Sequence, residues 1–214
     1  MERIVDDDPY SSSAERYDER FDANRFVYDA ELRAVRSLFA PTVHPAIEVG
    51  VGTGRFAAPL GIGVGIDPSE GMLRMARARG IAVARGVAEN LPVRDLAAGC
   101  ILMVTAICFV SDAVRAFEES FRVLKRGGAI VIGMLDRASP VGRTYGERKQ
   151  TSPFYRHARF YSVAEVLDML RQTGFRDFDL RQTIFEQASR IGQDETVRTG
   201  HGEGLFAVIR ARKD

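Results

Sequence analysis

The chain has 214 residues, of which 45% are hydrophobic and 28% charged, and a formal net charge of +1. This composition excludes a disordered or fibrous protein, and the small net charge gives no bulk attraction to nucleic acid or to an anionic membrane. No apolar run is long enough to span a bilayer and the acidic start is unlike a signal peptide, so we expect a cytoplasmic enzyme or ligand-binding protein.

The first half of the chain alternates short apolar runs with helical segments. After an arm rich in Asp and Ser, the spacing of apolar residues predicts a helix over 26–39, which ends at Pro41. Apolar runs bounded by Gly or Asp-Pro predict strands at 46–49, 61–67, 81–84 and 100–105. Ser69 is placed to cap the helix after the second strand, and Gly80 to end it. The first crossover, which contains Pro59, is so short that its helix must be abbreviated.

The second half continues the alternation up to its last two strands. A helix is expected over 112–125, ended by Gly127 and Gly128, followed by a fully apolar strand at 129–135. Ser162 begins a further helix, with Glu165 completing a capping box. The final strands are predicted at 178–186 and 204–212.

Repeated strand–helix units predict a mostly parallel sheet with helices on both faces. The last two strands have no helix between them, so one of them should be antiparallel. In such sheets ligands bind beyond the carboxyl ends of the strands, where the strand order reverses. Functional residues are therefore expected in the loops after the first, second and fourth strands.

A glycine-rich loop, EVGVGTGR over 48–55, follows the first strand. Arg55 stands where a dinucleotide fingerprint needs its third glycine, and no Gly-Lys-Ser/Thr follows for a P-loop. Glu48 would repel a diphosphate but suits a ligand with an ammonium or sulfonium charge. The alternative is a tight turn with a surface glutamate.

Asp67 closes the second strand. A carboxylate at this position can accept two hydrogen bonds from a ribose diol. The alternative is an Asp-Pro turn that only begins the next helix. The two cysteines, Cys100 and Cys108, lie in an apolar run and are expected to be reduced core residues.

Four segments in order, EVGVGTGR, GIDPS, GVAENLP and LKRGGAIVIG, resemble the signatures of class I S-adenosylmethionine-dependent methyltransferases. The resemblance extends from about Ile47 to Met134. It implies a three-layer, Rossmann-like α/β fold whose seven-stranded sheet is mostly parallel, with one antiparallel strand near the C-terminus. It also implies S-adenosylmethionine as cofactor and S-adenosylhomocysteine as product. We expect one methyltransferase domain over 1–214, with an N-terminal arm and lid helices in 1–40.

The resemblance further implies a set of cofactor-binding residues: Tyr17, Glu48, Gly50, Gly52, Gly54, Asp67, Pro68, Ser69, Ala88, Glu89 and Thr105. In this set Glu48 would face the methionyl ammonium, with the glycines packed against the cofactor. Asp67 would bind the ribose hydroxyls, and the two residues after it would lie near the adenine.

The remaining members of the set surround the ends of the cofactor. The backbone N–H of Ala88 and the neighbouring Glu89 would border the adenine edge. Val87 occupies a position where many relatives have Asp, so this sequence departs from the pattern there. Thr105 would lie beneath the reacting sulfonium, and Tyr17, in a stretch that resembles the lid helix of the family, would reach the methionyl end.

A lid-like insertion over 137–161 carries six Lys or Arg residues against one acid, Glu147, together with several aromatic residues. It is either a lid over an aromatic-lined pocket that prefers anionic acceptors or a solvated basic surface loop. His157 and Tyr155 are weak candidates for a general base. The spacing of the histidines matches no metal site, so none is expected.

We therefore predict a methyltransferase (EC 2.1.1.-) that acts on an unidentified small-molecule acceptor by in-line displacement. The alternatives are an RNA or protein methyltransferase, a non-catalytic S-adenosylmethionine-binding protein and, more distantly, a nicotinamide enzyme. A nucleic-acid acceptor would need a broader basic face than one insertion supplies. No membrane partner is expected, and the protein would be a monomer or a homodimer.

Overall fold

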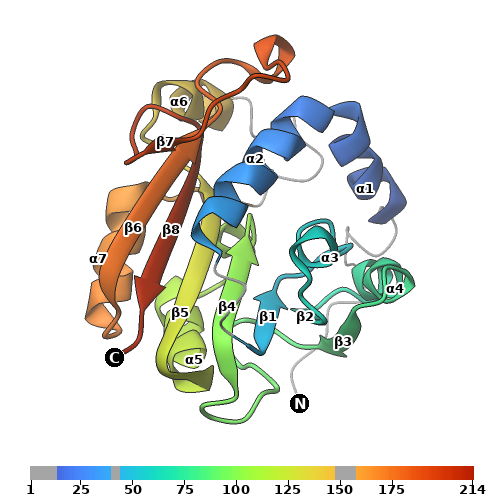
Figure 1. The fold of residues 1–214 in the computed structure, drawn as a ribbon, viewed down its shortest axis with the longest axis vertical. Helices are drawn as coiled ribbons and strands as arrows, with labels where there is room; N and C mark the ends of the chain where they lie inside the picture. The colour runs from blue at the N-terminus through green and yellow to red at the C-terminus, as the bar shows by residue number, and fades with distance from the viewer. Residues whose placement is uncertain (1–13, 40–43, 148–157) are drawn as a thin grey trace.

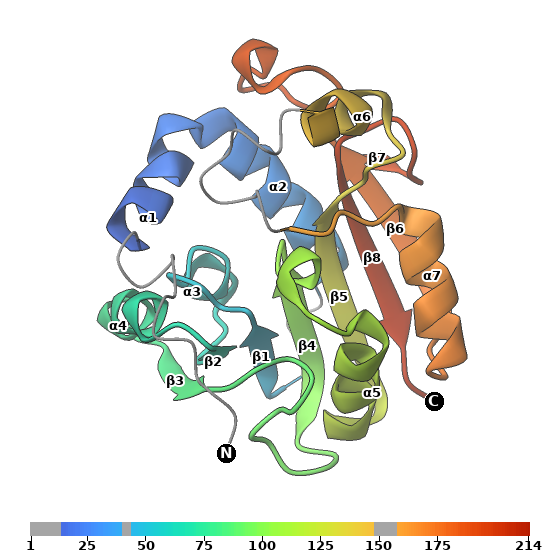
Figure 2. The same ribbon diagram turned by 180° about the vertical axis from the view of Figure 1, so that it is seen from behind.

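The computed structural model describes residues 14–39, 44–147 and 158–214, and it has helices on both faces of one central sheet (Figures 1 and 2). The strands are β1 (Ala46–Val49), β2 (Val64–Asp67), β3 (Ala82–Arg85), β4 (Ala98–Val104), β5 (Leu124–Leu135), β6 (Arg176–Thr183), β7 (Arg198–Thr199) and β8 (Phe206–Arg212). The helices are α1 (Ala14–Ala23), α2 (Arg25–Leu38), α3 (Ala57–Leu60), α4 (Glu70–Ala78), α5 (Ala113–Val123), α6 (Pro140–Glu147) and α7 (Val163–Gln172).

The strand order is β3-β2-β1-β4-β5-β8-β6-β7. β1 to β5 pair in parallel, and β8 is antiparallel to both of its neighbours, so the expectation of one antiparallel strand among the last two is confirmed. The expected count of seven strands is too low by one. The additional strand is β7, a two-residue edge strand that pairs with Arg181 and Gln182 of β6.

The predicted boundary between the helix over 112–125 and the strand over 129–135 differs from that of the structure. The helix expected over 112–125 ends at Val123 because the chain enters β5 at Leu124, which pairs with Ala98. Gly127 and Gly128 therefore lie within β5 instead of ending the helix. The first crossover helix, α3, is abbreviated to four residues as expected.

Apolar residues fill both sides of the sheet. On one face α2, α3 and α4 cover a cluster that includes Leu73 and Phe206, and on the other α5 and α7 cover a cluster that includes Phe117 and Phe175 (Figures 1 and 2). All residues of β1 and β4 are buried, as befits central strands covered on both faces.

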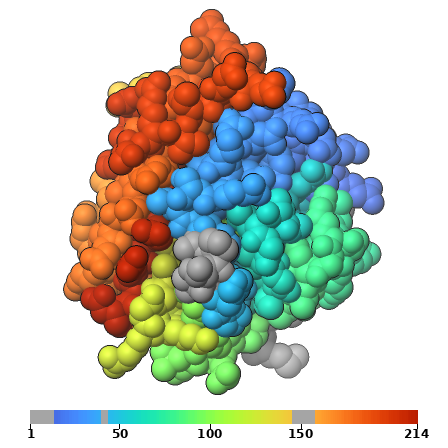
Figure 3. All heavy atoms as spheres, in the orientation of Figure 1, coloured from blue at the N-terminus to red at the C-terminus, as the bar shows by residue number. Residues whose placement is uncertain are grey.

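The strand order reverses beside β1, because the chain crosses from β3 back to β4 on the other side of it. This reversal opens a crevice at the carboxyl ends of β1 and β4. On the surface, α2 runs between the glycine-loop region and the C-terminal segments (Figure 3). The fold thus brings the loops after β1, β2 and β4 together with α1 and α2.

Candidate functional site

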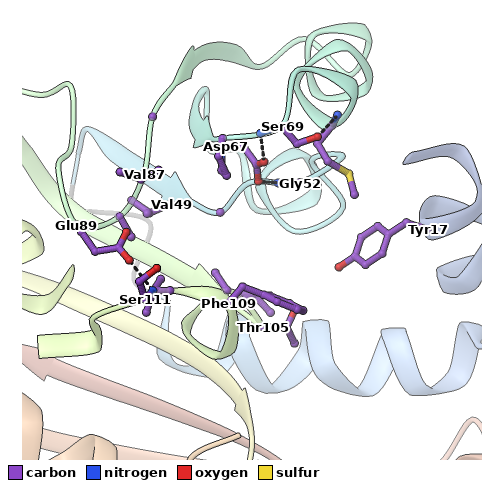
Figure 4. Close-up of a pocket in the computed structure, with 18 residues that line it drawn as sticks. Tyr17, Val49, Gly52, Asp67, Ser69, Val87, Glu89, Thr105, Phe109 and Ser111 are labelled. Atoms are coloured by element: carbon purple, nitrogen blue, oxygen red, sulfur yellow. Dashed lines mark hydrogen bonds between the residues drawn. The ribbon is translucent and has the colours of Figure 1, made fainter. Parts of the chain in front are cut away.

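A cavity of about 230 Å³ lies at the carboxyl ends of β1, β2, β3 and β4 (Figure 4). We call it the first cavity. It is lined by Tyr17, Val49, Gly50, Gly52, Asp67, Pro68, Ser69, Met72, Gly86, Val87, Ala88, Glu89, Val104, Thr105, Ala106, Phe109, Val110 and Ser111. The structure thus brings together nine of the eleven residues predicted to bind a cofactor. The exceptions are Glu48 and Gly54.

Asp67 is held at the wall of the first cavity by backbone hydrogen bonds. The N–H of Gly52 donates to its Oδ2 at 2.9 Å, and the N–H of Ser69 donates to its Oδ1 at 2.9 Å (Figure 4). Each carboxylate oxygen has a further lone pair, so the group can accept hydrogen bonds from a ligand diol as well. These two contacts fix the carboxylate between the glycine loop and the start of α4.

The glycine loop needs its glycines for two separate reasons. Gly50 has φ +73°, and a Cβ there would overlap the side chain of Ala106 from the loop after β4. Gly54, with φ +86°, would direct a Cβ into Ile81. The missing Cβ at Gly50 leaves space beside Ala106 at the wall of the cavity. The missing Cβ at Gly54 lets the glycine loop pack closely against Ile81, just after α4.

Glu48 is buried on β1 and is not part of the lining of the first cavity. Its Oε2 has no hydrogen-bond partner among the residues that the structure describes. Burial raises the pKa of this carboxyl well above its usual value; a hydrogen bond from the backbone of Ala57 opposes the rise and the charge of Asp67 adds to it. An unpartnered buried carboxylate favours a cationic group nearby.

The far end of the first cavity is largely apolar. Val87 and Phe109 line this end and are 45% and 38% exposed, so each presents apolar surface that a planar ring can contact. Glu89 accepts hydrogen bonds from the N–H groups of Ser111 and Asp112, at 2.6 and 3.3 Å. Its carboxylate therefore ties this wall to the loop after β4.

Thr105 and Tyr17 close the other end. Thr105 follows β4 with φ +50°, a strained conformation for a residue with a Cβ. Tyr17 points from α1 into the cavity (Figure 4). Burial raises the pKa of Tyr17 to about 12, against the opposing influence of Arg20 and a side-chain hydrogen bond with Thr105.

A network of ion pairs, which the sequence reasoning missed, fastens α1 to the glycine loop. Arg55 binds Asp18 and Asp22 at 2.7 Å each, and Arg79 binds Asp18 at 2.7 Å. Burial opposes ionisation of Asp18, but hydrogen bonds from Arg55, Thr53 and Arg79 outweigh it and lower the pKa. The available signal was the spacing of Asp18 and Asp22, four apart on one helix face.

A second cavity, of about 240 Å³, adjoins the first and shares Thr105 with it. Its lining comes from α1, Asn24 and α2 on one side and from the end of β5 and the segments after β4, β6 and β7 on the other: Arg20, Phe21, Asn24, Val27, Tyr28, Glu31, Thr105, Leu135, Ile184, Ala188 and Leu205. Burial raises the pKa of Glu31 to about 8, with the charge of Arg20 opposing the rise. The sequence reasoning identified none of these residues except Thr105.

The predicted insertion contributes little to either cavity in the part that is described. Arg137 pairs with Glu165 at 2.7 Å, and the guanidinium of Arg159 lies 5.0 Å from the centre of the Tyr161 ring. Neither arginine lines one of the two cavities. The candidate bases His157 and Tyr155 lie outside the described residues.

Three further features concern the cysteines, clusters of metal-binding side chains and membrane-spanning helices. Cys100 and Cys108 are buried and form no disulfide, and the Cys108 thiol donates to the carbonyl of Thr105. The described residues contain no cluster of three or more His, Cys, Asp or Glu side chains able to hold a metal ion. No helix in the described ranges is both long enough and apolar enough to cross a membrane.

The profile of a family described as "Methyltransferase domain" matches residues 47–132. An uncharacterized protein of Methanocaldococcus jannaschii is 41% identical, over 95% of this chain and 98% of its own.

Two solved structures share the fold. A Thermotoga maritima S-adenosylmethionine-dependent methyltransferase, described as a possible histamine N-methyltransferase, is 45% identical with a TM-score of 0.92, covering 96% of this chain and 99% of its own. The Haemonchus contortus phosphoethanolamine N-methyltransferase 2, crystallised with S-adenosylmethionine, is 17% identical with a TM-score of 0.62, covering 86% of this chain and 52% of its own. At that identity the second likeness shows the fold alone.

Proposed function

The chain belongs to the class I S-adenosylmethionine-dependent methyltransferases, and on this premise we propose that the first cavity holds S-adenosylmethionine and the second cavity a small-molecule methyl acceptor. The observation that carries the proposal is the shared wall at Thr105: two cavities of similar size meet at one residue beyond β4. Methyl transfer needs such an arrangement, because donor and acceptor must approach along one line.

The residues of the first cavity fit an adenosyl amino acid. Asp67, fixed by two backbone N–H groups, would accept hydrogen bonds from the ribose hydroxyls. Val87 and Phe109 offer apolar surface to the adenine ring. The unpartnered carboxyl oxygen of Glu48 would attract the methionyl ammonium, through water because Glu48 does not line the cavity.

When bound, the cofactor supplies a methyl group already activated by a sulfonium sulfur. The protein therefore has to align the acceptor and exclude water. Tyr17 would cover the junction of the two cavities from α1, and Thr105 would form its floor. The phenol of Tyr17 stays protonated at neutral pH, since burial raises its pKa to about 12, so it would act as a hydrogen-bonding group and not as a base.

We further propose that residues 1–214 form one methyltransferase domain, in which the segment 1–40 and the insertion 137–161 act as covers of the site. Supporting this, Asp18 and Asp22 of α1 are tied to Arg55 beside the glycine loop. A helix held by ion pairs can be released and rebound without unfolding the sheet below it.

A small acceptor agrees with the volume of the second cavity and with the absence of a basic groove leading into it among the described lining residues. The names of two relatives refer to different acceptors. The Thermotoga protein is described as a possible histamine N-methyltransferase, and a Methylococcus capsulatus relative, 30% identical over 61% of this chain, is a malonyl-[acyl-carrier protein] O-methyltransferase. Family membership alone therefore leaves the acceptor open.

Calorimetry with the purified protein tests the proposal. S-adenosylhomocysteine should bind, and NAD at the same concentration should give no heat of binding. With S-adenosylmethionine, a panel of small amines, phenols, thiols and carboxylates should then include at least one compound that releases S-adenosylhomocysteine. Binding of NAD in place of S-adenosylhomocysteine would contradict the cofactor site, and binding without turnover across the panel would contradict the transfer function.

A further inference from the structure

The second cavity contains one carboxylate, Glu31, on its α2 side. The rest of its lining is uncharged apart from Arg20, and much of it is apolar, including Phe21, Val27 and Leu135. Among the described residues the Glu31 carboxylate forms no salt bridge, and the charge of Arg20 lowers its pKa against the effect of burial. A carboxylate in such surroundings lacks the hydration and hydrogen bonds that normally stabilise it.

Two other polar groups of the second cavity are already engaged in hydrogen bonds. The hydroxyl of Tyr28 donates to the carbonyl of Arg55 at 2.6 Å, and the amide of Asn24 donates to the carbonyl of Arg20 at 2.9 Å. The guanidinium of Arg20 lies 5.5 Å from the centre of the Tyr17 ring, whose face attracts the positive charge. Glu31 is therefore the acidic group of this lining that a cationic ligand can approach, with the charge of Arg20 acting on it from α1.

We propose that the second cavity takes a small organic amine as methyl acceptor, with Glu31 binding its ammonium group and accepting a proton from it. This inference rests on the proposed function, since it assigns the acceptor of the same site. The insertion at 137–161 left open a preference for anionic acceptors; the second cavity is lined by one acid, Glu31, and one base, Arg20, and it is the position of Glu31 that favours a cationic group.

The proton balance of the reaction follows from the amine. An ammonium has no lone pair, so it cannot attack a methyl group until it loses a proton. Glu31 takes this proton and becomes a neutral acid, and the amine nitrogen gains its lone pair. The nitrogen then bonds to the methyl carbon while the carbon–sulfur bond breaks and its electron pair stays on sulfur. The products are neutral S-adenosylhomocysteine and a methylated ammonium.

The pH dependence of Glu31 suits this role. Because its pKa is about 8, most of the Glu31 carboxyl is protonated at neutral pH. An incoming ammonium stabilises the carboxylate and lowers this pKa, so ligand binding is coupled to ionisation. The titratable groups facing it are Arg20 and the phenol of Tyr17, both on α1. The opposite wall, with Thr105, Leu135, Ile184 and Leu205, carries no charge.

The test compares three ligands of one shape on protein saturated with S-adenosylhomocysteine. These are 2-phenylethylamine, 2-phenylethanol and 3-phenylpropionate, titrated by calorimetry into wild type, Glu31→Gln and Asp29→Asn. Asp29 lies on the same helix, outside both cavities, so its variant has the same change of charge without the contact. The amine should bind wild type at least about tenfold more tightly than the alcohol or the acid, and Glu31→Gln should lose about tenfold for the amine alone.

Asp29→Asn should behave as wild type. The outcomes also separate this inference from the function on which it rests. If wild type fails to bind S-adenosylhomocysteine, the proposed function fails. If it binds S-adenosylhomocysteine but shows no preference for the amine, or if Glu31→Gln keeps that preference, the assignment of Glu31 is wrong while the cofactor site stands.

A second readout separates a base from a merely structural residue. For any amine that wild type methylates, kcat/KM should rise with pH towards about 8, because kcat/KM reports the free enzyme. Glu31→Gln should lose this rise, and Glu31→Asp should restore part of it. A rise of the same size and midpoint in Glu31→Gln would overturn the role of Glu31 as base.

Discussion

The two cavities that meet at Thr105 are built in different ways. The first is made largely of backbone and of loop residues that directly follow adjacent parallel strands, and its key carboxylate, Asp67, is fixed by the N–H groups of Gly52 and Ser69. The second is made of side chains from α1, α2 and the C-terminal loops, which meet only because the chain folds back over the sheet. The strand ends of the sheet and their loops thus form the first cavity, whereas the helices and loops that cover the sheet form the second.

Because of this difference, side-chain substitutions should affect cofactor binding and acceptor binding to different extents. A ligand held by strand-end backbone is insensitive to most side-chain substitutions. A ligand held by helix and loop side chains can be exchanged through a few positions such as Glu31 or Ala188. The same sheet can therefore retain its cofactor while the acceptor changes.

The largest expected effect breaks the first cavity alone. In Gly50→Ala the added Cβ would overlap Ala106 and strain a residue at φ +73°. We expect S-adenosylhomocysteine affinity to fall by about 100-fold or more, measured by calorimetry. Gly61→Ala is the matched control, since Gly61 has φ +71° but nothing within 4 Å of the new Cβ. It should lower the melting temperature slightly and leave binding unchanged; equal loss in both variants would attribute the effect to strain.

Asp67→Ala should come next. Removing the carboxylate removes the acceptor for the ribose hydroxyls and frees the N–H groups of Gly52 and Ser69. Hydrogen bonds to charged groups contribute about 1.5–3 kcal/mol, so S-adenosylhomocysteine affinity should fall at least about tenfold. Asp168→Ala, on an exposed part of α7, is the control. Unchanged affinity in Asp67→Ala would defeat the ribose assignment.

Glu48→Gln probes the buried carboxyl under the first cavity. The pKa of Glu48 is raised in the folded state, so its protonated form stabilises the folded protein at low pH. This contribution to the free energy of unfolding is lost as the pH rises from the usual pKa of a glutamate through the raised pKa of the folded state. Without ligand, Glu48→Gln should therefore lose less stability than wild type as pH rises over that window, as thermal melts would show. S-adenosylhomocysteine affinity should fall about fivefold, and wild type alone should release a proton on binding. Equal proton release by both proteins would show that Glu48 does not interact with the ammonium group of the ligand.

Arg55→Ala should act on the part that the two cavities share. Loss of the pairs with Asp18 and Asp22 leaves Arg79 as the ion-pair partner of Asp18 and so loosens α1, which carries Tyr17 for the first cavity and Arg20 for the second. We expect about a threefold loss of S-adenosylhomocysteine affinity and faster proteolysis within α1. Arg25→Ala, which removes an exposed pair with Asp29, should change neither. Unaltered proteolysis in Arg55→Ala would show that the pairs do not hold the helix.

The smallest effect on the cofactor should come from filling the second cavity. Ala188→Trp places a large side chain on an exposed loop that lines it, whereas Ser189→Trp places the same group beside it. Both should bind S-adenosylhomocysteine within about twofold of wild type. Only Ala188→Trp should lower turnover of an acceptor. Equal turnover in both variants would contradict an acceptor site there.

Nine of the eleven residues predicted to bind a cofactor line the first cavity, because its parts are local in the sequence. Asp67 follows a strand, Ser69 caps the next helix, and the glycine loop follows β1, so strand-end logic brings them together. Glu31 and Arg20 gave no such signal. Glu31 lies in a segment that was read only as a helix with apolar spacing, and Arg20 lies in the stretch that resembles the lid helix, where only Tyr17 was predicted to reach the site. Their position depends on how α1 and α2 cross the sheet. The extra strand β7 escaped prediction because two residues have no periodicity.

The structure of the protein bound to S-adenosylhomocysteine tests the central claim most directly. We expect ribose hydroxyls on Asp67, adenine between Val87 and Phe109, and a sulfur at Thr105 that faces the second cavity. It would be contradicted by a ligand whose sulfur faces away from Thr105, or by one bound elsewhere on the sheet.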